Sequence, residues 1–151
     1  MPKFFNSKDL DFIKTISEEV VDYVVEQAVT LFKVSVGETK TNLYGESLGK
    51  VWRAPSTIMA IVDREPMNVV YEGFGADSSQ TVEFRFNRIT LEDTGFYPED
   101  GDIIFHNNGY FEIDNVREDQ LIGGQSGEKF SIICSTFMTR RSSIQTEMRV
   151  I

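Results

Sequence analysis

Residues 98–116 constrain the fold more than any other part of the chain, because they specify a turn, a strand, a tight turn and a second strand in succession. Asp100-Gly101 is a typical turn pair, since glycine adopts positive φ without steric cost and aspartate tolerates the same region. Asn108-Gly109 favours a two-residue hairpin loop whose twist matches the flanking strands. We therefore predict that residues 102–107 pair with residues 110–116. An isolated hairpin is only marginally stable, so this one must belong to a larger sheet or barrel.

The amino-terminal part predicts an amphipathic helix over residues 8–28. Ser7 is a suitable N-cap with Asn6 beside it, and acidic residues follow in the first turn, where the helix dipole favours negative charge. Residues 20–25 are rich in β-branched side chains, which weakens the helical preference toward the end of this segment. An apolar stripe recurs at steps of three and four residues and comprises Phe12, Ile13, Ile16, Val20, Val24, Ala28 and Leu31.

The remainder of the chain reads mainly as strands. Residues 29–36 and 130–138 are predicted strands, and residues 58–62 form a continuous apolar run that predicts a strand buried on both faces. Val82, Phe84 and Phe86 alternate with polar residues, which predicts a half-buried strand. Residues 38–55, 73–79 and 123–127 are predicted loops. The prediction is one domain of the α+β class, mainly β. An outer helix precedes an antiparallel β-barrel or sandwich of about six strands over residues 29–138, and residues 139–151 form a polar carboxy-terminal arm.

Composition limits the functions that such a domain can have. The 151 residues carry a net charge of −9, which argues against wrapping a nucleic-acid backbone but allows a wall past which a polyanion slides. Twelve Phe residues predict either a dense core or apolar faces that meet other subunits. No apolar run approaches the roughly 20 residues that span a bilayer, and no export signal is evident, so we expect no membrane partner. The single cysteine, Cys134, agrees with a reducing compartment.

Three segments were candidates for chemistry, and each favours a structural interpretation. Residues 45–51 resemble a phosphate-binding loop, but one residue is missing between the glycines and Val51 occupies the position of the Mg²⁺-binding hydroxyl. Cys134 and His106 are a possible thiol and imidazole pair, although Cys134 sits in an apolar strand. Glu99, Asp100 and Asp102 lack the spacing of a Ca²⁺ loop. We therefore expect no enzymatic activity, no cofactor and no metal.

Several of these segments together resemble the neck, or head-completion, protein of bacteriophages with contractile tails. The shared order is an acidic glycine-containing loop, an aromatic residue, an apolar strand ending in aspartate, an alternating strand, and a hairpin introduced by Pro-x-x-Gly-Asp. The resemblance covers most of residues 43–116. Its segments are residues 43–47, Val51-Trp52, and residues 58–63, 82–86, 98–105 and 110–116.

The resemblance implies a head-closure, or stopper, ring that is assembled in the host cytoplasm and becomes part of the virion. A hexamer of this chain would lie between the portal and adaptor proteins above and a tail-terminator or tail protein below. Double-stranded DNA would pass through the channel without sequence-specific binding. Closed rings are built from heterologous contacts.

Within that interpretation, two segments are candidates for the loop that lines or closes the channel. One is residues 38–52; the other, which we favour, consists of Gly73, Phe74, Gly75, Ala76, Asp77, Ser78 and Ser79. Trp52 is a candidate interface anchor, with a core role as the alternative. The other interface candidates are Leu43, Tyr44, Arg140, Arg141 and Arg149, the three arginines forming a positive tail that we expect to reach an acidic partner ring.

Two other functions remain open at this point. The chain could be a tail-terminator or adaptor ring of the same neck. It could also be a small-barrel nucleic-acid-binding module with Phe84, Phe86 and Phe111 as stacking platforms, although acidic residues lie among them. A hydrolase that uses His106 or the clustered carboxylates is the least favoured interpretation.

Overall fold

The computed structural model describes residues 6–25, 27–35, 37, 39, 43–44, 50–73, 75–120, 129–140 and 149–150. Helix α1 (Ser7–Glu19) continues into a π-helical segment, η1 (Val20–Val25), so the predicted helix is present. The N-cap is Asn6 rather than Ser7, and the Asp9 carboxylate accepts the Asn6 backbone N–H at 3.2 Å. The wider π-helical turns coincide with the β-branched run that weakens the helical preference.

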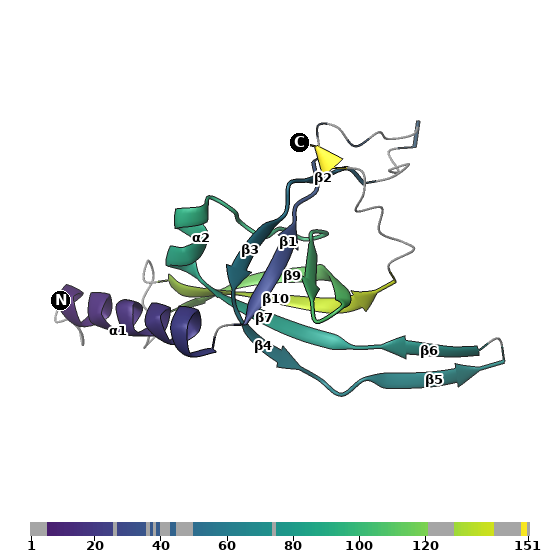
Figure 1. Ribbon diagram of the computed structural model, residues 1–151, viewed down its shortest axis with the longest axis horizontal. Coiled ribbons are helices and arrows are strands. Elements are labelled where there is room, and N and C mark those ends of the chain that lie inside the picture. Colours follow the sequence, from purple (N-terminus) through teal and green to yellow (C-terminus); the bar gives the residue numbers. More distant parts are fainter. Residues whose placement is uncertain are drawn as a thin grey trace.

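The strands follow α1, and a second short helix interrupts them (Figure 1). The elements are β1 (Ala28–Phe32), β2 (Trp52–Arg53), β3 (Ser56–Met59), β4 (Ile61–Arg64), β5 (Asn68–Glu72), β6 (Gly75–Ser79), β7 (Thr81–Asn87), α2 (Arg88–Thr94), β8 (Ile103–His106), β9 (Gly109–Gln120), β10 (Lys129–Thr139) and β11 (Arg149–Val150).

Seven of these strands form a closed antiparallel barrel. Their order is β3-β1-β8-β9-β10-β7-β4, and every neighbouring pair is antiparallel. The two edge strands of this sheet, β3 and β4, are separated in the sequence only by Ala60. They are therefore two halves of one bent segment: β3 pairs with β1 and β4 pairs with β7, which closes the sheet into a barrel. The α+β prediction with a small antiparallel barrel is therefore confirmed.

The barrel interior holds one apolar core. Alternate residues of β1 and of most of β7 point inward, as expected when one face of an antiparallel sheet is buried, whereas β8 and β10 bury consecutive residues. The predicted burial of residues 58–62 on both faces is wrong, because Ile58 and Ala60 are buried whereas Ile61 is 37% exposed. The buried members of the core are Val29, Leu31, Ile58, Ala60, Val82, Phe84, Phe86, Leu91, Ile104, Phe111, Ile113, Ile132 and Cys134.

The hairpin of residues 98–116 forms as β8 and β9, but its turn lies one residue earlier than predicted. Asn107 and Asn108 take the positive φ values, 50° and 62°, and His106 pairs with Gly109. Asparagine tolerates positive φ because its short polar side chain can form a hydrogen bond with the nearby backbone. Gly109 is needed for a different reason, since a Cβ there would lie 3.0 Å from Cε2 of the Phe111 ring.

A buried carboxylate organises the Pro-x-x-Gly-Asp segment. Asp102 is 2% exposed and accepts the backbone N–H groups of Val34 at 3.0 Å and Glu99 at 2.9 Å. Burial raises the pKa of Asp102, and the two hydrogen bonds and the charge of Lys33 oppose that shift. Lys33 also donates to the Tyr97 carbonyl at 2.6 Å. Asp102 therefore joins the segment after β1 to the turn before β8.

The carboxy-terminal segment does not simply leave the barrel, as predicted for residues 139–151. Arg149–Val150 forms β11, which pairs in parallel with β2 through Arg149↔Trp52 and Val150↔Arg53. Residues 141–148 and residue 151 lie outside the described residues. In the part of the chain that the structure describes, no helix has the length and apolar character needed to cross a membrane.

Candidate functional site

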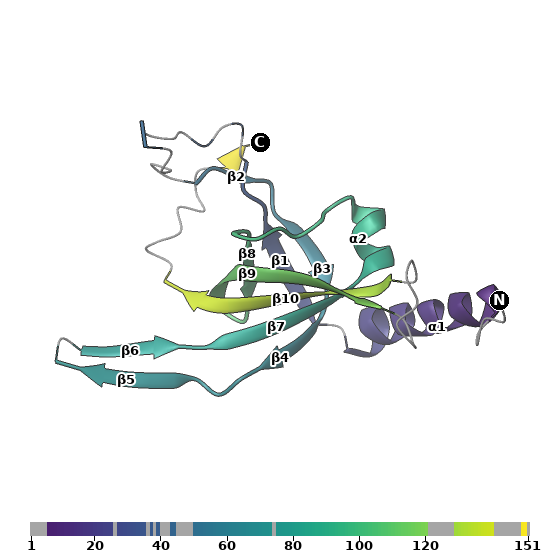
Figure 2. The same ribbon diagram turned by 180° about the vertical axis from the view of Figure 1, so that it is seen from behind.

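A two-stranded arm projects from the barrel and contains the residues predicted to line the channel. β4 and β7 continue beyond the barrel wall into β5 and β6, as both views show (Figures 1 and 2). We term residues 65–80 the arm. The prediction of a loop over residues 73–79 is wrong for most of the segment, because Gly75–Ser79 is strand β6, paired with β5 from Asn68↔Ser79 to Glu72↔Gly75. Gly73 lies at the turn, and Phe74 lies outside the described residues.

The two strands of the arm differ in chemistry. β5 reads Asn-Val-Val-Tyr-Glu and β6 reads Gly-Ala-Asp-Ser-Ser. Val69, Val70 and Tyr71 are strong β-formers, which explains why their weakly β-forming partners in β6 become extended. Their side chains are 45%, 53% and 82% exposed, and the preceding Met67 is 48% exposed. β5 therefore presents apolar side chains to solvent, and Ser78 and Ser79, the residues of β6 whose side chains the structure describes, are exposed as well.

Several contacts fix the base of the arm to the barrel. The Glu65 N–H donates to the Thr81 carbonyl at 3.1 Å, and the Gln80 side-chain amide donates to the Glu65 carbonyl at 2.9 Å. Arg64 lies over the Phe111 ring, 5.4 Å from its centroid, and its Nη2 is 2.7 Å from His106 Nδ1. Because arginine can only donate, His106 Nδ1 is the acceptor in this contact.

His106 gives the fold a defined pH dependence. Burial, and then the charge of Arg64, lower the pKa of His106 in the folded protein. The unfolded chain therefore takes up the proton first, so this contribution to stability is present above the ordinary pKa of about 6.5 and is lost as the pH falls below it. We expect the free energy of unfolding, measured in urea, to decrease from about pH 7.5 to about pH 5.5.

The matched variant for this prediction is His106→Gln, which keeps an acceptor for Arg64 but does not titrate. Its free energy of unfolding should change less over the same pH interval. An equal decrease in the variant and the parent protein would show that His106 is not the source.

Helix α1 and the η1 segment that continues it share an apolar face that the rest of the chain leaves exposed. The predicted stripe faces solvent for much of its length, because the helix uses Leu10 and Val21, which are 4% and 3% exposed, as its buried positions. The Ser17 carbonyl accepts the side-chain amide of Asn87 at 3.2 Å, which ties the helix to the end of β7. The exposed residues are Phe12 at 66%, Ile16 at 42%, Val20 at 41%, Tyr23 at 75% and Val24 at 76%.

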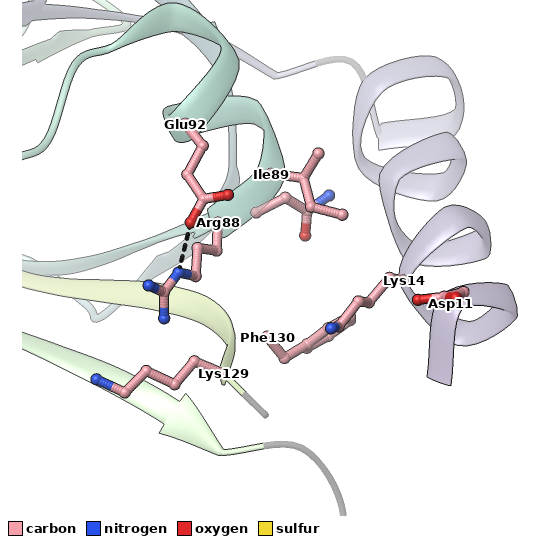
Figure 3. Close-up of a pocket in the computed structure, with 8 residues that line it drawn as sticks. Asp11, Lys14, Arg88, Ile89, Glu92, Lys129 and Phe130 are labelled. Atoms are coloured by element: carbon pink, nitrogen blue, oxygen red, sulfur yellow. Dashed lines mark hydrogen bonds and ion pairs between the residues drawn. The ribbon is translucent and has the colours of Figure 1, made fainter. Parts of the chain in front are cut away.

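A cleft of about 410 Å³ lies between α1, α2 and the start of β10 (Figure 3). Arg88 Nε donates to Glu92 Oε1 at 2.8 Å, and Arg88 and Lys129 both pair with Glu118. The cleft thus combines cations, carboxylates and apolar side chains, and no pattern in the sequence indicates that these positions meet. Its lining residues are Asp11, Lys14, Asn87, Arg88, Ile89, Glu92, Lys129 and Phe130.

The residues predicted to form an interface differ in how exposed they are and in whether the structure describes them. Trp52 is 1% exposed and packs with Ile103, which favours the core role over the role of interface anchor. Leu43 and Tyr44 are 102% and 91% exposed, as an interface would require. Arg140 is exposed, Arg141 lies outside the described residues, and the structure describes only the backbone of Arg149, in β11.

Of the segments considered for chemistry, residues 45–49 lie outside the described residues, and Cys134, His106 and Asp102 make contacts within the fold. Burial raises the pKa of Cys134 to about 12, so its thiol stays protonated near neutral pH. The imidazole of His106 contacts Arg64 and, at 3.4 Å, the Gln27 side chain. Asp102 is a buried acceptor of backbone N–H groups. Among the described residues, no group of three or more histidine, cysteine or acidic side chains is placed to hold a metal ion.

No protein-family model matches the chain, and no curated protein matches it. Its function must therefore be argued from the barrel, the arm, the exposed face of α1 and the cleft.

Proposed function

We propose that this chain is a non-enzymatic structural protein of the bacteriophage neck. It forms a ring, of hexameric symmetry, between the portal and adaptor proteins and the tail. The ring continues and closes the DNA channel, retains the packaged genome and provides the site of tail attachment. The observation that carries this proposal is a closed barrel with exposed apolar side chains concentrated on two projecting elements, α1 and the arm.

Exposed apolar surfaces of this kind favour an assembly of many copies. Monomeric proteins rarely leave large contiguous apolar patches uncovered, and such patches mark contacts with other proteins. α1 and the arm extend from opposite ends of the barrel (Figures 1 and 2). Different surfaces at the two ends support heterologous contacts, which close into a ring when the rotation between neighbours permits.

The polar strand of the arm suits the wall of a DNA channel. Residues 65–80 contain Glu65, Glu72 and Asp77 and no lysine or arginine. A surface without cations does not bind phosphates by releasing counterions, so DNA can slide past it. We assign β6, with Gly73 at the turn, to the channel side of the arm.

The alternative function, a small-barrel nucleic-acid-binding module, depended on aromatic rings that could stack on bases. Phe84, Phe86 and Phe111 are each 0% exposed, so their rings are not available for stacking on bases. Cations on the outer surface of the barrel pair with carboxylates, as Arg117 does with Glu83 at 2.8 Å. A tail-terminator or adaptor ring would share the geometry described here, and its position in the particle distinguishes it from a stopper.

Electron microscopy of the purified protein and of labelled virions tests the proposal. We expect closed rings with a central channel, and antibodies raised against the protein should label virions at the junction of head and tail. A protein that forms no ring and labels no virion would contradict the proposal. A density map of the ring in which β6 faces away from the channel would overturn only the assignment of the arm.

A further inference from the structure

We propose that the contact between His106 and Arg64 fixes the arm to the barrel only while the His106 imidazole is neutral, so that uptake of one proton releases the base of the arm. In mild acid the arm is then free to change its orientation relative to the barrel. The inference concerns the subunit by itself and does not depend on the proposed ring.

Arg64 lies at the junction of the barrel and the arm. It is the last residue of β4, which leads directly into the arm at Glu65 (Figure 1). Its backbone pairs with Val82 of β7, whereas its side chain extends to the hairpin of β8 and β9, where it contacts His106 and lies over the Phe111 ring. β8 and β9 are not neighbours of β4 in the sheet. The Arg64 side chain therefore joins the start of the arm to a part of the barrel that the strand pairing of β4 does not reach.

The contact requires a neutral imidazole. Arg64 Nη2 lies 2.7 Å from His106 Nδ1 and donates to the His106 carbonyl at 3.4 Å. Because a guanidinium can only donate hydrogen bonds, Nδ1 must accept, and the ring proton is assigned to Nε2, which lies 3.4 Å from Gln27 Oε1. A second proton on the ring occupies Nδ1, removes the acceptor and makes the imidazole a cation beside the guanidinium. Protonation thus turns an attractive contact into a repulsive one.

The surroundings of His106 make this contact sensitive to mild acid. Side chains from three elements face the ring: Arg64 from β4, Phe84 from β7 and Gln27 just before β1. Of these three, Arg64 carries a charge, and it is positive. Burial, and then the charge of Arg64, lower the pKa of His106. When Arg64 has moved away, the pKa of His106 lies closer to its ordinary value of about 6.5, so a proton binds the released state more tightly. A fall in pH through this region therefore shifts the population toward release.

The other contacts at the base of the arm do not titrate. The Glu65 N–H donates to the Thr81 carbonyl at 3.1 Å, the Gln80 side-chain amide donates to the Glu65 carbonyl at 2.9 Å, and the Met138 N–H donates to the Gln80 carbonyl at 2.9 Å. These hydrogen bonds join backbone and amide groups, which keep the same charge at every pH considered. We therefore expect the arm to stay a hairpin and to move as a unit when Arg64 is released.

Distances between two nitroxide labels measure the orientation of the arm. One label is attached at Tyr71→Cys on the arm, and the other at Asp114→Cys, an exposed position on β9. Cys134 stays unlabelled, because it is buried and burial raises the pKa of its thiol to about 12. We expect the distribution of distances, recorded by pulsed electron paramagnetic resonance, to be at least about twofold wider at pH 5.5 than at pH 7.5.

A second pair of labels, Asp93→Cys on α2 with Asp114→Cys, reports on the barrel without the arm. Its distribution should be the same at both pH values. A distribution for the arm pair that does not widen in acid would overturn the proposal. Equal widening for both pairs would show that acid loosens the whole barrel, and would overturn it as well.

Two variants assign the effect to the contact itself. His106→Gln keeps a side-chain oxygen that can accept from Arg64 but does not titrate, so the arm pair should stay narrow at pH 5.5. Arg64→Met lacks the guanidinium, so the arm pair should already be wide at pH 7.5 and should not change with pH. Widening in acid that persists in His106→Gln, or a narrow distribution in Arg64→Met, would show that this contact does not hold the arm.

Discussion

Trp52→Ala lowers the free energy of unfolding by about 3–5 kcal/mol, because it removes a large buried side chain and leaves a cavity that the surroundings fill only in part. Trp52 is 1% exposed and forms a cluster with Ile103, against which Phe32, Val34 and Tyr110 pack. This cluster lies apart from the main barrel core, so other core residues do not replace its contacts. Urea denaturation of the purified subunit measures the effect.

Trp52→Phe is the matched control for this prediction. The Nε1 atom of Trp52 is buried and has no hydrogen-bond partner among the described residues, so phenylalanine removes volume without breaking a hydrogen bond. We expect it to cost less than half as much as alanine. A Trp52→Ala protein that unfolds like the parent but assembles poorly would restore the interpretation of Trp52 as an interface anchor.

Asp102→Ala is expected to have the second largest effect, a loss of about 2–5 kcal/mol of unfolding free energy, because it removes a buried carboxylate that accepts two partly buried backbone N–H groups. The carboxylate accepts the N–H groups of Val34 and Glu99 and lies 3.9 Å from Lys33 Nζ. The contacts with Val34 and Lys33 connect segments that are far apart in the sequence, and the contact with Glu99 holds the local turn. Thermal and urea denaturation should both report the loss.

Asp102→Asn separates the hydrogen bonds from the charge. The side-chain oxygen of asparagine can accept a hydrogen bond from one of the two N–H groups. Its NH₂ group is itself a donor and cannot accept a hydrogen bond from the other N–H group. We therefore expect a smaller loss than in Asp102→Ala. An Asp102→Ala protein as stable as the parent would show that the Pro-x-x-Gly-Asp segment does not depend on this carboxylate.

The sequence was sufficient to predict the main elements of the barrel where local chemistry is strong. Alternation of Val82, Phe84 and Phe86 fixed which face of β7 is buried, and the turn residues around Asn108 predicted the hairpin. The position of the turn was off by one residue, since either Asn-Asn or Asn-Gly can adopt positive φ. The crowding that a Cβ at position 109 would meet against the Phe111 ring arises only in the folded barrel, so local patterns do not indicate it.

The arm and the cleft could not be predicted from local patterns. Gly75–Ser79 has the composition of a loop, and only its pairing with β5 makes it a strand. The apolar stripe over α1 and η1 indicated a helix correctly but did not indicate which positions are buried; Leu10 and Val21 are buried, while Phe12 and Tyr23 remain exposed. The cleft combines α1, α2 and β10, whose proximity depends on the closure of the whole sheet.

The bent segment from β3 to β4 determines how slowly the subunit must fold. β4 pairs with β7 and β8 pairs with β9, which are contacts between segments close in sequence, whereas β1 pairs with β8 across some 70 residues. β3 also pairs with β1, so the sheet closes only when the distant pairing of β1 with β8 has formed. That pairing costs the conformational entropy of closing a long loop. Topologies dominated by such contacts fold in milliseconds to seconds. The long-range pairing of β1 with β8 is therefore expected to slow the folding of this chain.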